Sequence, residues 1–175
     1  DLIERRYLAL CWGHPDRADP RLSARPGVSF DTAGWIRIET MLGRDPTDRK
    51  RMAVIGSGGR IAVTRLRPLE TFGPAEKPFA SLVECRLETG RTHQIRVHAA
   101  HIGHSLVGDP IYGHARVLSA SVDARTRAAL GAFSRQALHA EVLGFDHPVT
   151  GQDVVFEAPL SPDMHEILTC MRRNR

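Results

Sequence analysis

The chain has 175 residues, of which 42% are hydrophobic and 25% are charged, and its formal net charge is +4. This composition is typical of one compact domain, and three cysteines without a CxxC pair argue against a disulfide scaffold or a zinc knuckle. No apolar run reaches the roughly 18 to 20 residues of a membrane-spanning helix, and residues 1–6 have no signal-peptide pattern. We expect Cys11, Cys85 and Cys170 to be buried, reduced thiols.

The first half of the chain predicts strands on either side of a long loop region. Tyr7–Trp12 is typical of a short strand, which the following Gly, His and Pro end. In residues 16–60, Arg, Gly, Pro and Asp are frequent and the periodicity is weak, so we expect loops and short hairpins over a core made elsewhere. Residues 61–70 and 81–87 alternate in polarity and predict two paired strands.

A helix is predicted over Thr92–Gly103, where the hydrophobic period changes. Ile95, Ala99 and Ile102 recur at helical spacing, Thr92 is a candidate N-cap, and Gly103 is a natural C-terminal stop.

The remaining elements predict a hairpin and two further helices. A turn at 108–110 precedes a short helix near 124–131. Residues 136–145 and 152–158 flank a turn and form a hairpin, and Ser161-Pro162 begins a final helix. The expected fold class is α+β, with a mixed, mainly antiparallel sheet and flanking helices, and residues 1–175 are expected to form a single domain.

The densest polar stretch is residues 89–98, TGRTHQIRVH. If it is helical from Thr92, then Arg91, Gln94, His98 and His101 lie on adjoining parts of one surface. Backbone amides at the helix start favour an anion, so this is a candidate phosphate site.

Arg96 points toward small residues, Ala99, Ala100 and Gly103, which allow its guanidinium to be partly buried. A buried arginine needs a carboxylate partner, because an unpaired buried charge is costly. The sequence offers no compelling local carboxylate, so we expect that partner to lie outside this chain.

Residues 89–98, together with residues 101–113 (HIGHSLVGDPIYG), resemble the signature of the RluA-like, ribosomal large-subunit type of pseudouridine synthases. That signature reads close to TGRTHQIRVH, a short helix, and GHPLVGDPLYG. Similar segments extend the resemblance over essentially the whole chain: residues 6–10 with Gly13, 51–54, 62–64, 135–140, 147–151 and 158–160.

The resemblance implies a pseudouridine synthase fold and the isomerisation of uridine to pseudouridine in RNA, without cofactor or metal. In this family an aspartate attacks the nucleotide, and the target base is flipped out of its stack. Tyr7 corresponds to the tyrosine that packs on the uracil ring and transfers a proton, and Arg96 to the arginine that pairs with the catalytic aspartate. Ile95 and Leu138 correspond to apolar positions in the pocket wall.

Candidate RNA-binding residues follow from the resemblance and from the charge pattern. They are Arg91, Thr92, His93, Gln94, Ile95 and His98 at the helix start, Lys50 and Arg51 with Arg44 and Arg49 in a basic loop, and Leu138. The expected partner is RNA, with 23S rRNA first and tRNA second, and we expect a cytoplasmic monomer that has no membrane contact.

The family's aspartate-bearing HRLD string is not found in these residues. Asp31, Asp109 and Asp146 lack its context, and we expect Asp109 to brace its turn. The chain is therefore expected to be the C-terminal portion of a catalytic domain, incomplete at its N-terminus and inactive by itself. A non-catalytic RNA-binding module is the alternative. A metalloprotein is disfavoured because the histidines between residues 93 and 104 lack the spacing of zinc ligands.

Overall fold

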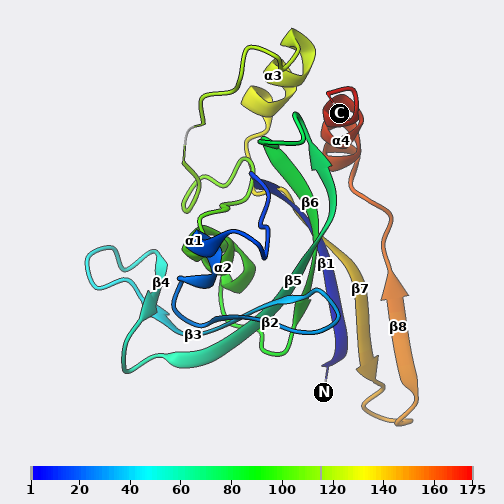
Figure 1. Cartoon of the computed structure of the whole chain (residues 1–175). Coiled ribbons are helices and arrows are strands. Elements are labelled where there is room, and N and C mark those ends of the chain that lie inside the picture. Colours follow the sequence, from blue (N-terminus) through cyan, green and yellow to red (C-terminus); the bar gives the residue numbers. More distant parts are fainter. Residues whose placement is uncertain (1, 115, 175) are drawn as a thin grey trace.

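A computed structural model describes residues 2–114 and 116–174, and it contains one eight-stranded sheet (Figure 1). The strand order is β2-β3-β5-β6-β1-β7-β8, with β4 paired to β3, and every pairing is antiparallel. The strands are β1 (Leu2–Trp12), β2 (Val28–Phe30), β3 (Ile36–Arg44), β4 (Met52–Ile55), β5 (Arg60–Phe72), β6 (Ala80–Leu87), β7 (Leu138–Asp146) and β8 (Asp153–Glu157). The helices are α1 (Pro20–Ser23), α2 (Gln94–His101), α3 (Ala124–Ala132) and α4 (Pro162–Arg172).

The two faces of the sheet carry separate hydrophobic cores, because side chains alternate along each strand. From β1, Ala9 and Cys11 face a core that includes apolar residues of α1 and α2. Leu10 and Trp12 face the opposite core, which includes apolar residues of α3 and α4. In Figure 1, α3 and α4 lie together near one end of the sheet, whereas α1 and α2 pack beside its middle. The expectation of an α+β fold with a mainly antiparallel sheet is confirmed.

The cysteine prediction is also confirmed. Cys11, Cys85 and Cys170 are buried and free. Burial raises the pKa of Cys11 to about 12, so its thiol stays protonated near neutral pH. Among the described residues, no helix is long and apolar enough to span a bilayer.

Short hairpins are present within residues 16–60, where β2 pairs with β3 and β3 pairs with β4. The expectation that this stretch lies over a core made elsewhere is wrong, because Leu22, Ile36 and Ile38 belong to the core. In β3, Ile36, Ile38, Thr40 and Leu42 are buried while the residues between them are at least partly exposed. The alternation of β3 is short and lies among Arg, Gly and Pro residues. This alternation identifies a strand only once β3 pairs with β5, and that pairing joins segments that are distant in the sequence.

Helix α2 begins later than predicted. Its N-cap is His93, in the left-handed region at φ 55°, and no side chain caps the helix. The C-terminal prediction is closer, since Gly103 follows the helix at φ +84°. A left-handed residue other than glycine is uncommon, and the ring of His93 contacts the Tyr112 hydroxyl.

Candidate functional site

Tyr7 lies in the middle of β1, opposite Cys85 of β6 and Ala140 of β7. The half-buried Tyr7 packs against the core cluster that contains Ile95 of α2, and Leu138 at the start of β7 packs against the same cluster. A register shift between Arg6 and Tyr7 interrupts the pairing of β1 with β7 at this point. The structure thus gathers three predicted pocket residues from three elements on one face of the sheet.

Arg96 does have a carboxylate partner in the chain, contrary to the sequence prediction. Nε and Nη2 of Arg96 donate to the two oxygens of Asp109, both over 2.9 Å. The side chains are 8% and 0% exposed, so this is a buried, bidentate ion pair. The hydrogen bonds that Arg96 donates to Asp109 raise the pKa of Arg96, which stays charged.

Asp109 also braces its own turn, as predicted. Its Oδ1 accepts the backbone N–H groups of Ile111 (3.0 Å) and Tyr112 (3.1 Å). Burial acts to raise the pKa of Asp109, but the hydrogen bonds from Arg96 and from these two amides outweigh it, and the pKa lies below its usual value. Asp109 is therefore a fully engaged carboxylate.

Tyr112 joins the start of α2 to the basic loop between β3 and β4. Its hydroxyl lies 2.8 Å from Nδ1 of His93 and accepts the Met52 N–H over 2.9 Å. The guanidinium groups of Arg96 and Arg51 lie over its ring, 5.1 and 5.3 Å from the centroid. The structure thereby brings the start of the signature helix and the basic loop together.

Gln94 is buried in a hydrogen-bond network and is not exposed at the surface. Its Nε2 donates to the carbonyl of Val63 (2.9 Å) and to Oγ1 of Thr64 (3.0 Å). Its Oε1 accepts from Oγ1 of Thr89 (2.7 Å) and from the Arg91 N–H (3.0 Å). All four hydrogen-bonding positions of this amide are used within the protein.

His98 continues the same network and is fully buried. Its Nδ1 lies 2.7 Å from Oγ1 of Thr64, and its Nε2 lies 2.9 Å from Oγ1 of Thr40. The expectation that Gln94 and His98 share an open surface with Arg91 is therefore wrong, because β3 and β5 cover that side of α2. Their side chains hold α2 against the sheet through hydrogen bonds to β3 and β5.

His98 predicts a specific pH dependence of stability. Burial lowers its pKa to about 3, whereas the unfolded chain takes up a proton near the ordinary value of 6.5. A depressed folded-state pKa of a base means that stability falls as the pH falls through the unfolded value. From pH 7 to pH 5, His98 alone should remove about 2 kcal/mol of unfolding free energy.

Urea unfolding of the wild type and of His98→Gln at both pH values measures this contribution. Glutamine keeps a donor and an acceptor for the two threonines but does not titrate. The wild type should lose about 2 kcal/mol more than the variant between pH 7 and pH 5. An equal pH dependence of the two proteins would show that His98 is not a buried neutral group.

The cations of the basic loop and of the helix start remain accessible. Lys50 and Arg49 are exposed, and Arg91 donates from Nε to the Ile61 carbonyl over 3.0 Å. Nε of Arg51 is buried, and within the described part of the chain it has no hydrogen-bond partner. Burial and the neighbouring Arg96 lower the pKa of His93, so this histidine adds no charge near neutral pH.

The histidines near the signature contact four different sites. His93 contacts Tyr112 and His98 contacts two threonines, while His101 and His104 lie 2.7 Å from the carbonyls of Pro26 and Trp12. Among the residues that the structure describes, no group of three or more His, Cys, Asp or Glu side chains is placed to hold a metal ion.

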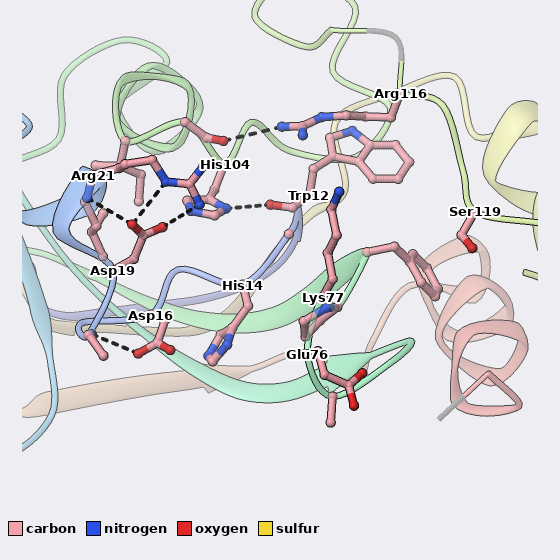
Figure 2. A pocket seen from close by; sticks show the side chains of 18 of the residues that line it. Trp12, His14, Asp16, Asp19, Arg21, Glu76, Lys77, His104, Arg116 and Ser119 are labelled. Carbon is pink, nitrogen blue, oxygen red and sulfur yellow. Dashed lines mark hydrogen bonds and ion pairs between the residues drawn. The ribbon is translucent and has the colours of Figure 1, made fainter. Parts of the chain in front are cut away.

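A cavity of about 870 Å³ lies at the Trp12 end of β1, away from these residues (Figure 2). Two of its arginines are engaged with the protein: Arg21 binds Asp19 (3.0 Å), and Arg116 donates to the Gly103 carbonyl (3.4 Å). The lining includes neither Tyr7 nor any residue of the signature 89–98. The candidate site is therefore the surface around Tyr7 and the start of α2.

Two residues of this region make contacts that were not predicted from the sequence. Tyr112 links two segments, and Asp109 binds Arg96, which lies 13 residues earlier. The signal available was their common position in the GDPIYG string, since a bracing aspartate and a tyrosine three residues later end on the same side of a tight turn.

Comparison with known proteins places this site in one family. The family model described as RNA pseudouridylate synthase matches residues 1–101. The protein of Neisseria meningitidis serogroup A named ribosomal large subunit pseudouridine synthase D is 46% identical over 167 residues, which cover 94% of this chain and 42% of that protein. A protein of Bacillus subtilis named as an uncharacterized RNA pseudouridine synthase is 48% identical over 137 residues, 78% of this chain and 39% of its own length. The chain thus spans about two fifths of the length of these relatives.

Solved structures give the same fold. Human RNA pseudouridylate synthase domain containing 1 matches with a TM-score of 0.63 and 28% identity, over 95% of this chain and 58% of that chain. Human RNA pseudouridylate synthase domain containing 4 matches with a TM-score of 0.60, over 97% of this chain and 62% of that chain. At 18% identity the second likeness supports the fold alone.

Proposed function

Because this chain belongs to the RNA pseudouridylate synthase family, we propose that it forms the RNA-binding surface and part of the catalytic pocket of an enzyme that converts uridine to pseudouridine in RNA. The observation that carries the proposal is that Tyr7 and Leu138 pack against the same hydrophobic cluster, on one face of the sheet, to which Ile95 of the signature helix belongs. The substrate proposed first is large-subunit rRNA, as the names of relatives suggest, and tRNA is second. The proposal also includes a monomeric state and a location in the cytoplasm, because the RNA substrate is found there.

In this proposal the target uridine leaves its stack and enters the surface around Tyr7. A tyrosine face stabilises a stacked base by about 1 to 3 kcal/mol, which offsets part of the cost of flipping. Ile95 and Leu138 form the apolar walls that exclude water from the ring. The hydroxyl of Tyr7 transfers a proton while the base detaches, turns and rejoins through carbon.

The nucleophile is proposed to come from residues of the protein outside these 175. Asp109 is unsuited to the role because its carboxylate is buried and accepts four hydrogen bonds. Arg96 is proposed to hold the incoming aspartate with Nη1, since its hydrogen bonds to Asp109 use Nε and Nη2. Asp109 would then keep the guanidinium in place before the nucleophile docks.

The cations around the helix start are proposed to bind the phosphates that flank the target base. Arg51, Lys50 and Arg91 are the first candidates, with Arg44 and Arg49 beside them. Affinity for RNA should therefore fall steeply with salt.

A tritium-release assay on uridine-labelled large-subunit rRNA tests the proposal. It compares this chain with a longer form that includes the residues encoded upstream. We expect release by the longer form alone, because only that form would carry the nucleophile. Salt-sensitive RNA binding by both forms without release would favour an RNA-binding module. Release by this chain alone would refute the account of the nucleophile.

A further inference from the structure

Arg5 lies on β1 two residues before Tyr7. Side chains two apart on a strand share a face, and their positions are about 7 Å apart. The pairing of β1 with β6 is regular here, with Arg6 opposite Arg86 and Tyr7 opposite Cys85. Arg5 therefore extends from the same side of the sheet as Tyr7, toward the loop that precedes α2.

The tip of Arg5 rests on Gly90. A Cβ atom added to Gly90 would overlap Nη1 of Arg5, and it would also lie 3.2 Å from its Cζ. Gly90 does not adopt a positive φ, so its backbone conformation does not require glycine. A side chain at position 90 would instead displace the guanidinium of Arg5, which lies against Gly90. Strand β1 and the signature string 89–98 thus meet at this contact.

Among the residues that the structure describes, no acidic side chain pairs with Arg5, in contrast to the arginines on the other face of the sheet. Arg6 donates to Glu141 over 2.8 Å, and Arg86 donates to Glu84 over 3.2 Å. Within the described part of the chain, no hydrogen bond or ion pair engages Arg5. A half-buried arginine that is held in position and has no partner among the described residues suits a ligand anion that accepts two parallel hydrogen bonds, as a phosphate does.

We propose that Arg5 binds the phosphate next to the uridine that stacks on Tyr7, and that Gly90 exists to let it reach there. The inference rests on the proposed function and extends it by one residue and one contact. The two positions are close enough for a single nucleotide to place its base on Tyr7 and its phosphate on Arg5. A guanidinium can hold a phosphate through two parallel hydrogen bonds, which also fixes the orientation of the nucleotide.

RNA binding measured over a series of salt concentrations tests this contact in the longer form of the protein. Arg5→Ala should weaken binding about fivefold at 0.1 M salt and reduce the slope of log K against log salt by about 0.7 to 1. Arg5→Lys should restore most of the slope because it keeps the charge. Gly90→Ala should weaken binding without any change of charge, because it displaces the guanidinium.

The double variant and a charge control sharpen the test. If Gly90 acts through Arg5, the double variant should bind no more weakly than Arg5→Ala, because the two changes remove one contact. Arg125→Ala removes the same charge from the exposed surface of α3 and should leave the slope nearly unchanged. Thermal unfolding of every variant separates a lost contact from a lost fold.

Three outcomes would overturn the inference. They are an unchanged salt slope in Arg5→Ala, a loss of isomerisation without a loss of binding, and additive effects of the two single changes. A loss of isomerisation without a loss of binding would indicate that Arg5 pairs with a carboxylate or takes part in the reaction. Failure of the proposed function is distinct, since a wild-type protein that binds RNA without isomerising it still reports the phosphate contact.

Discussion

Replacing Asp109 by alanine should lower the unfolding free energy by about 3 to 5 kcal/mol. The change leaves the charged guanidinium of Arg96 buried without its carboxylate, and it removes the acceptor for the Ile111 and Tyr112 amides. Breaking a buried ion pair from one side is costly because the remaining charge cannot recover its hydration. Urea unfolding at pH 7 measures the loss.

Asp163→Ala is the matched control for Asp109→Ala. Arg135 binds Asp163 through Nε (2.7 Å) and Nη2 (2.8 Å), the same bidentate geometry, but these side chains are 41% and 46% exposed. Exposed pairs contribute at most about 1 kcal/mol. The loss of unfolding free energy should therefore be at least about 2 kcal/mol larger for Asp109→Ala than for Asp163→Ala, although each change removes one carboxylate from a bidentate pair. Equal losses would contradict the burial of the Arg96 pair.

Tyr7→Phe in the longer protein should lower the rate of isomerisation by about 10² to 10⁴-fold while RNA affinity stays within about twofold. Phenylalanine keeps the ring on which the base stacks, so the fall in rate should measure the contribution of the hydroxyl alone. Tyr7→Ala should also weaken binding, since it removes about 1 to 3 kcal/mol of stacking. Single-turnover tritium release and equilibrium binding separate the two effects.

Tyr112 is the second tyrosine of the chain and gives the control for Tyr7→Phe. Its hydroxyl accepts the Met52 N–H and contacts His93, so Tyr112→Phe should cost about 1 to 3 kcal/mol of stability. The rate of isomerisation should fall much less than in Tyr7→Phe. Equal losses of rate in the two variants would contradict the special role of Tyr7.

Much of the sheet could be predicted because its strands carry their own signal. Residues 61–70, 81–87, 136–145 and 152–158 correspond to β5, β6, β7 and β8, and the Ser161-Pro162 start of α4 also appears in the structure. Strand β3 was missed because its four alternating buried residues gain their meaning from pairing with β5. Pairing with a distant strand cannot be predicted from the local sequence of a segment that is rich in turn residues.

The signature predicted the wrong orientation for two of its side chains, Gln94 and His98. An amphipathic helix has one buried stripe, and that assumption placed Gln94 and His98 on a surface. In the structure, residues 94 to 99 of α2 are all buried, so helical periodicity cannot separate an inner face from an outer one. The partner of Arg96 escaped prediction because Asp109 returns to the helix only after the chain turns at Gly103.

The central claim is that RNA approaches the surface around Tyr7 and the start of α2. The most direct test is to map the backbone amide shifts of this chain by ¹H–¹⁵N NMR during titration with a uridine-containing single-stranded RNA. We predict that the largest shifts cluster at Tyr7, Leu138 and residues 89–93. Shifts confined to the cavity of Figure 2, around Trp12 and Lys77, with Tyr7 unchanged, would contradict the account.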